Sequence, residues 1–323
     1  MALGVVAVTT AQTRTTDYLK KIPPLPKDSC NVSKAAAGSY VSMVDGLGNQ
    51  LQADLDAINE KVNQHMEANE GNARDNAMQQ MSQTYGISQA DLEKMRNSKN
   101  MTAAEKQALA NKMMSQQTNM TVDEAKNVGK MSDAGKQAYA EAYAMEAMAT
   151  QQTDPNQATR NQTAQNKYQS VVSQQAANAK VSEISTKIAA LYTQIDSDPE
   201  RQAMLDRIDG WQNKVNSMIG IVSDGDARIM DSLSLRIKNE KIAYCNKYTP
   251  KYRTALRKHL EIIKTSMPDY VNLGNATADA TKIQSGIEMP AEGRELPGLN
   301  AINGYLSKLG DVYKYKLYFV EDE

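Results

Sequence analysis

The sequence holds two histidines, His65 and His259, which lie far apart in the chain. Nucleophilic sites of the Ser-His-Asp and Cys-His types need a base oriented beside the nucleophile, and neither histidine belongs to a motif that supplies one. His259 is flanked by Arg257, Lys258 and Glu261, a charge pattern that predicts a solvent-exposed helix face. Since no HExxH motif is present either, the histidines predict no catalytic site and no zinc site of that type.

The two cysteines, Cys30 and Cys245, lack the close spacing of metal ligands. They can form one intramolecular disulfide, which would fasten the N-terminal region to a distant helix. Closing so long a loop contributes about 4–5 kcal/mol in the chain-entropy model. In a reducing cytosol the same residues would be two separate buried thiols. In an exported protein, a disulfide between Cys30 and Cys245 is the preferred interpretation.

Two D-x-D segments, which begin at Asp196 and Asp224, share the first residues of a calcium-binding loop. An EF-hand loop needs glycine at its sixth position and glutamate at its twelfth, and neither segment has them, so helix capping explains these acids. Gly-rich phosphate loops are absent from the sequence. The single tryptophan, Trp211, shares a helical stripe with Ile208 and Val215 and is predicted to lie in a core. The sequence therefore predicts no catalytic, cofactor-binding or metal-binding residue, and the chain is predicted not to be an enzyme.

The composition indicates helices. The chain of 323 residues has 37 basic and 38 acidic residues, and this balance argues against a nucleic-acid or anionic-membrane surface. It is poor in aromatic residues and contains 18 methionines; Met, Ala, Gln, Lys and Glu favour helix over strand. No segment approaches the roughly 20 apolar residues of a transmembrane helix. An all-α protein without a transmembrane segment is predicted.

Proline content and apolar spacing divide the N-terminal part of the chain. Residues 12–32 are predicted to form an extended Pro-rich strap, because "PPLP" forbids helix. Residues 33–71 are predicted to form a long helix that ends near Gly71. Its apolar stripe recurs every three or four positions and consists of Val44, Leu47, Leu51, Leu55, Ile58, Val62 and Met66.

Residues 151–285 are predicted to complete a helical bundle. New helices are expected after turn signals at Asp198–Pro199, 223–226 and Thr249–Pro250, where a capping residue precedes the first turn. Pro268 is expected to kink or restart the last of them. Short connectors between long amphipathic helices favour antiparallel neighbours, so the predicted architecture is an elongated up-and-down bundle.

Residues 72–150 are predicted to form an inserted subdomain of short helices rich in Met and Gln. Three segments carry a hydroxyl residue followed three positions later by an acid: Ser88/Asp91, Thr102/Glu105 and Thr121/Glu124. The last two pairs are predicted to be capping boxes. Four methionines could form an adaptable apolar groove for a partner: Met113, Met114, Met145 and Met148. The simpler interpretation is that they fill the core of the subdomain.

Residues 286–323 are predicted to form a loop, a short helix and a short strand-like tail. The alternation in "DVYKYKLYFVEDE" is typical of a strand. The candidate partner-binding residues of this tail are Tyr313, Tyr315, Leu317 and Phe319. Such a strand could be donated to the sheet edge of a partner, or the tail could pack on its own bundle.

Residues 1–11 are interpreted as the remnant of a signal peptide, because a run of small apolar residues precedes the small side chains at Thr9–Ala11. The junction of Ala11 and Gln12 resembles the signal peptides of Bacteroidetes. The segment "YGISQADLEKM" is similar to segments of uncharacterised exported all-helical proteins of Bacteroidetes. This resemblance covers a minor part of the chain, implies a periplasmic or secreted location and carries no activity with it.

These features predict a non-catalytic exported helical scaffold or protein-binding module. A protein partner is expected but not identified by the sequence, and formation of a homo-oligomer stays open. The alternative is a periplasmic holdase-type chaperone, whose long helices would embrace unfolded clients. Helical holdases of that kind are strongly basic, whereas this chain has a net charge of −1.

Overall fold

The computed structural model describes residues 14–26, 33–85, 102–108, 111, 157–220 and 223–318. The regular secondary structure of these residues is helical, which confirms the predicted all-α class. The chain divides into two compact units: the first consists of Met1–Asn63, Gln174–Ala278 and Pro290–Glu323, and the second of Gln64–Ser173 and Asp279–Met289. No helix within the described ranges combines the length and hydropathy needed to cross a membrane.

Helix α2 (Lys34–Tyr85) starts where the sequence predicts, because Ser33 caps it. The Ser33 hydroxyl accepts a hydrogen bond from the Ala36 amide at 3.2 Å. The predicted end near Gly71 is wrong, since α2 continues through this glycine. One glycine costs a helix only about 1 kcal/mol relative to alanine, which a helix of this length tolerates. Helix α7 (Gln157–Asp196) is also long.

The segment of residues 14–26 is only in part the extended strap that its prolines predict. Residues 14–21 are helical, and regular structure is lost from Pro23 on. The prolines end this helix because they lack an N–H group and restrict the preceding residue. Tyr18 is buried and donates a hydrogen bond to Asp54 at 2.6 Å, so the segment is fixed to α2.

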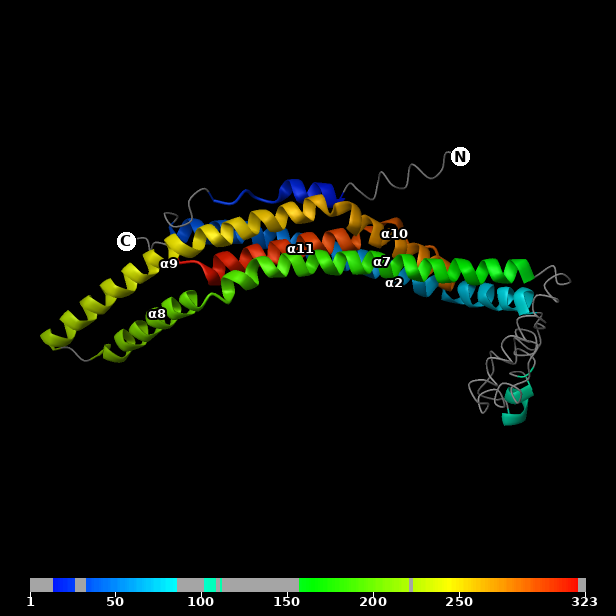
Figure 1. Ribbon diagram of the computed structural model, residues 1–323, viewed down its shortest axis with the longest axis horizontal. Helices are drawn as coiled ribbons and strands as arrows, with labels where there is room; N and C mark the ends of the chain where they lie inside the picture. Colours follow the sequence, from blue (N-terminus) through cyan, green and yellow to red (C-terminus); the bar gives the residue numbers. More distant parts are fainter. Residues whose placement is uncertain are drawn as a thin grey trace, which may run out of the picture. The chain divides into compact units, whose positions relative to one another are not determined.

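Helices α8 (Pro199–Met218) and α9 (Asp224–Thr265) form a hairpin, seen at the left of Figure 1. Its start is as predicted: the Asp198 carboxylate caps α8 by accepting a hydrogen bond from the Glu200 amide at 3.0 Å, and Pro199 is the first helical residue. At the turn, Gly220 has a φ of 99°, a left-handed conformation that glycine adopts without steric cost.

The helix start predicted at Thr249–Pro250 is wrong, because Pro250 lies inside α9. A proline within a helix removes one backbone hydrogen bond. The buried side chains of Tyr248 and Tyr252 hold both halves of α9 against the same core, so packing outweighs the local cost. The next helix, α10 (Met267–Ser285), begins beside Pro268, where a kink or a restart was predicted.

The C-terminal region differs most from the prediction, because it contributes heavily to the core of the first unit. After the short helix η2 (Ala291–Glu295), α11 (Leu296–Asp311) buries Leu299, Ile302, Tyr305, Leu306 and Leu309. The predicted strand-like tail is wrong over Val312–Lys316, which continue α11 as the π-helical turn η3. Val312 and Tyr313 follow Leu309 by three and four positions, so they extend its buried stripe.

Figure 1 shows α11 between α9 and α7. The core cluster of the first unit takes side chains from these three helices and from α2. Its largest fully buried members are tyrosines, namely Tyr244, Tyr248, Tyr252 and Tyr305. Buried tyrosine hydroxyls usually find a hydrogen-bond partner, and three of these tyrosines bring polar groups into the core: Tyr244 bonds to Arg201, Tyr248 to Asp198 and Tyr252 to Asp196.

In the second unit, the described residues 102–108 contain a short helix whose predicted capping box is confirmed. The Thr102 amide donates a hydrogen bond to the Glu105 carboxylate at 2.8 Å, and the Glu105 amide donates one to the Thr102 hydroxyl at 3.3 Å. The other two predicted pairs, Ser88/Asp91 and Thr121/Glu124, lie outside the described residues.

Gly274 of α10 lies against the backbone that precedes α11. A Cβ atom at this position would be 1.9 Å from the Arg294 carbonyl oxygen, so the Gly274→Ala variant requires the backbone to move. We expect it to lose about 2 kcal/mol of unfolding free energy in urea denaturation. The control is Gly210→Ala in α8, where a Cβ meets nothing within 4 Å and a gain of up to about 1 kcal/mol is expected. Equal effects of the two variants would contradict the close approach.

Candidate functional site

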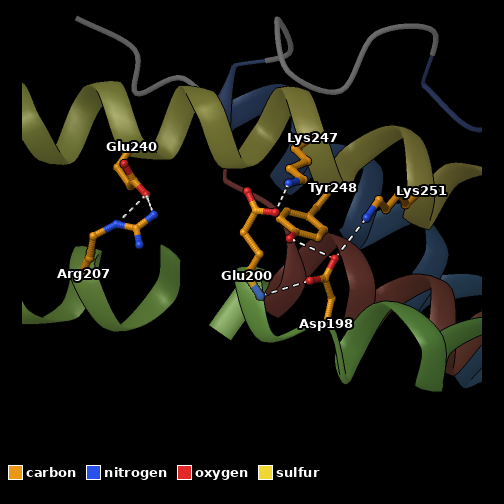
Figure 2. A network of polar contacts seen from close by, with 7 residues as sticks. All are labelled: Asp198, Glu200, Arg207, Glu240, Lys247, Tyr248 and Lys251. Carbon is orange, nitrogen blue, oxygen red and sulfur yellow. Dashed lines mark hydrogen bonds and ion pairs between the residues drawn. The ribbon is translucent and has the colours of Figure 1, made fainter. Parts of the chain in front are cut away.

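A polar network centred on Asp198 holds the base of the α8–α9 hairpin (Figure 2). Besides capping α8, the Asp198 carboxylate accepts hydrogen bonds from the Tyr248 hydroxyl and the Lys251 ammonium, each at 3.1 Å. The hydrogen bond from Lys251, assisted by those from Tyr248 and the Glu200 amide, holds the pKa of Asp198 below its ordinary value. Burial and the nearby Asp198 carboxylate raise the pKa of Tyr248 to about 12. At neutral pH, therefore, the acceptor is charged and the hydroxyl is protonated, which favours this contact.

A buried arginine, Arg201, extends the network into the core. Its Nε donates a hydrogen bond to the Tyr244 hydroxyl at 3.0 Å, and its guanidinium lies 6.0 Å and 5.9 Å from the ring centroids of Tyr244 and Tyr252. A guanidinium nitrogen is 3.8 Å from the Asp196 carboxylate, which also accepts a hydrogen bond from the Tyr252 hydroxyl at 2.5 Å. Tyr244, Tyr248 and Tyr252 are spaced by four residues, so they share one face of α9.

Two ion pairs continue the contact between α8 and α9 along the hairpin (Figure 2). Lys247 pairs with Glu200, and the Arg207 Nε lies 2.9 Å from a Glu240 carboxylate oxygen. The described part of the chain contains no cluster of three or more His, Cys, Asp or Glu side chains that could hold a metal ion. The polar groups at the base of the hairpin, Asp198, Tyr248 and Lys251, bond to one another. We call this group the clamp, because it joins α9 to the start of α8.

Beyond this clamp, the hairpin exposes large apolar side chains. Ile219, Ile229, Leu235 and Ile242 are exposed to 69%, 46%, 59% and 47%, whereas Leu233 and Ile237 of the same hairpin are buried. Trp211, which was predicted to lie in a core, is only partly buried and is not a member of the core cluster. The hairpin thus combines a fixed base with an apolar surface that no described residue covers.

Most of the partner-binding residues predicted from the sequence are not assembled into a site. Met113, Met114, Met145, Met148 and Phe319 lie outside the described residues. Of the tail residues, Tyr313 and Leu317 are buried in the core and Tyr315 is exposed. Because residues 312–316 are helical and Tyr313 and Leu317 are covered, the tail offers no described strand for donation to a partner.

Cys245 is buried and disulfide-bonded, with its sulfur 3.4 Å from the Thr249 hydroxyl. Its predicted partner, Cys30, lies outside the described residues. The pairing of the two cysteines therefore stays a prediction.

The prediction of an exposed His259 is wrong. Its neighbours Arg257 and Lys258 are exposed, but His259 itself is buried. It follows Tyr252 by seven positions and precedes Ile263 by four, and this spacing places it on the apolar face of α9. Its Nδ1 lies 2.9 Å from the Tyr192 hydroxyl of α7.

Sequence reasoning missed the tyrosine face of α9 and the buried Arg201. The signal was available: tyrosines at positions 244, 248 and 252 share a helical face, and an arginine follows the capping aspartate of α8 by three positions. Arginine is seldom buried unless it is paired, so its residue type alone does not point to the core. The fold is that of an all-α bundle with a two-helix hairpin. Comparison of the chain with family models, with curated proteins and with solved structures gave no match.

Proposed function

We propose that the chain is a non-catalytic helical protein-binding module, in which the α8–α9 hairpin contacts the partner. The observation that carries this proposal is the exposure of Ile219, Ile229, Leu235 and Ile242 on a hairpin whose base is clamped. Apolar anchors on a rigid support lower the entropic cost of association, because little has to be ordered on binding. Leu235 and Ile242 are one heptad apart, so together they present one face of α9.

The experiment is site-specific photo-crosslinking in the native cells. We expect a benzophenone amino acid at position 235 or 242 to give a discrete adduct with another protein. The matched position is Lys258, an exposed residue of the same helix, where no such adduct should form. In binding assays with the captured protein, the variant Leu235→Gln/Ile242→Gln should weaken binding at least about ten-fold and leave the thermal midpoint nearly unchanged. Adducts of equal yield at all three positions, or at none, would refute the proposal.

One observation favours a holdase-type chaperone as the second candidate function. Ile229 and Leu235 are six positions apart and therefore lie on different sides of α9, although both are exposed. Apolar groups on two sides of a helix suit clients without a fixed shape. Suppression of the aggregation of an unfolded outer-membrane protein by the purified chain, lost in the Ile229→Gln variant, would favour this candidate over a module with one dedicated partner.

We also propose that the protein works in an oxidising compartment, periplasmic or extracellular. Cys245 is disulfide-bonded, and such bonds persist mainly outside the reducing cytosol. Alkylation of the protein isolated from its native cells, followed by mass spectrometry, should find no free thiol before reduction and two after it. Two alkylated cysteines without reductant would exclude this location.

A further inference from the structure

A groove of about 750 Å³ lies in the first unit, lined by residues of α7, α9, α10 and α11. This volume lies in the range of small-molecule sites. The groove has apolar walls that include Ile188 and Ala301, and it is lined by the polar side chains of Tyr192, His259, Tyr270 and Lys308. It makes no use of the exposed apolar residues of the hairpin, so a role for it is independent of the proposed function.

Two nearly buried side chains of the groove keep a polar atom without a protein partner. His259 and Tyr270 are exposed to only 5% and 4%. No described residue bonds to the second ring nitrogen of His259 or to the Tyr270 hydroxyl. Among the described residues, the fully enclosed side-chain atoms without a partner are Tyr40 Oη and Glu295 Oε2. The second ring nitrogen of His259 and the Tyr270 hydroxyl are not fully enclosed, and both residues line the open space of the groove. Buried polar groups are normally satisfied, and unsatisfied ones that face an opening indicate a ligand.

The hydrogen bond to Tyr192 defines what His259 offers. In the tautomer in which the Tyr192 hydroxyl donates to His259 Nδ1, 2.9 Å away, Nδ1 is the acceptor. This bond leaves the ring proton on Nε2, which becomes a donor. Burial and the nearby Lys308 ammonium lower the pKa of His259 to about 4. At neutral pH the imidazole is therefore uncharged and presents an N–H group.

Lys308 supplies the positive charge of the groove. Its ammonium lies 4.6 Å from the Tyr192 ring centroid, and no carboxylate of the described residues pairs with it. The one acid among the lining residues, Asp196, is engaged by Arg201 at 3.8 Å and by Lys316 at 3.4 Å. The groove thus offers one cation and two neutral donor groups beside apolar and aromatic walls.

We propose that this groove binds a small organic carboxylate with an aromatic or aliphatic body. A carboxylate matches one ammonium and two neutral donors in charge and in hydrogen bonding, and the body would lie against the rings and Ile188. A phosphate ester fits less well, because the lining residues include no arginine.

The test uses 4-fluorophenylacetate as the probe and 4-fluorophenylacetamide as its neutral counterpart, both followed by fluorine NMR with the full chain. We expect saturable binding of the acid and at least about ten-fold weaker binding of the amide. Lys308→Met should weaken binding of the acid about ten-fold without affecting the amide, and Tyr270→Phe should weaken both. Lys258→Met, at an exposed lysine of α9, is the matched control and should change neither.

A second readout locates the probe and does not depend on the fold of a variant. A bound carboxylate stabilises the imidazolium, so the acid should raise the pKa of His259 in a proton NMR titration, with His65 as the internal reference. Equal affinity for acid and amide, an unaltered His259 titration at saturation, or the absence of saturable binding would each overturn the proposal.

Discussion

Arg201→Met is expected to lower the free energy of unfolding by about 3 kcal/mol at pH 7, measured by urea denaturation with linear extrapolation. The arginine is buried, and its loss removes a hydrogen bond to Tyr244 and two ring contacts. It also deprives Asp196 of one cation. Asp196 keeps Tyr252 and Lys316 as partners, so the cost should lie at the lower end of the range for a broken buried ion pair.

Arg207→Gln on the same helix is the matched control. Its partner is Glu240, but the Arg207 side chain is 47% exposed, and exposed ion pairs contribute about 0–1 kcal/mol. The two arginines therefore separate the effect of burial from the effect of charge. Similar losses in both variants would show that Arg201 contributes no more than a surface ion pair.

The cost of Arg201→Met should also depend on pH. Burial alone would raise the pKa of Asp196, but the Tyr252 hydroxyl, Lys316 and Arg201 together hold it below its ordinary value of 3.8. A carboxyl group with a lowered pKa stabilises the folded state above its unfolded pKa and loses this contribution as the pH falls through the folded value. The difference between the variant and the wild type should accordingly be constant from pH 6 to 8 and shrink below pH 3.8.

The sequence predicted those features that depend on local chemistry. Caps at Ser33, Asp198 and Thr102 were recognisable because a short polar side chain satisfies amides two or three residues away. Apolar spacing placed Leu51 and Leu55 on a buried face, and both are in the core. Such features need no knowledge of the rest of the chain.

Features that depend on tertiary contacts were predicted wrongly. Pro250 is an effective stop signal in isolation, and only the burial of Tyr248 and Tyr252 keeps α9 continuous. The Tyr–Lys alternation after Asp311 fits a strand, yet Val312, Tyr313 and Leu317 also fit the spacing of a helix, and the preceding α11 decides between the two. His259 was assigned by the charge of its neighbours, although its own position belongs to the apolar stripe. In each case the missing information was which surface the segment packs against.

Glu295→Met is expected to raise the free energy of unfolding by about 3 kcal/mol at pH 8. Glu295 is buried at the start of α11, and its Oε2 has no hydrogen-bond partner. Burial raises the pKa of Glu295 to about 7 from its ordinary 4.5, with Arg14 acting against this shift and Glu292 adding to it. The folded state therefore retains a proton that the unfolded chain releases, and stability falls between pH 4.5 and 7. Methionine is similar in size to glutamate and does not ionise, so the substitution removes the free-energy cost of a buried carboxylate.

The pH dependence of the gain from Glu295→Met distinguishes an effect of ionisation from an effect of packing. Below pH 4.5 the Glu295 carboxyl is neutral in both states, so the gain from methionine should largely disappear there if ionisation is its cause. Glu292, three residues earlier, is the control: its hydrogen bond with Lys61 lowers the pKa of its carboxyl, so Glu292→Gln should cost stability at pH 8 and cost less at pH 4, below the unfolded pKa. Chemical denaturation of the three proteins from pH 4 to 8 gives the comparison. A gain from Glu295→Met that is equal at both ends of this range would mean that the methionine improves packing, and that the buried carboxylate carries no ionisation cost.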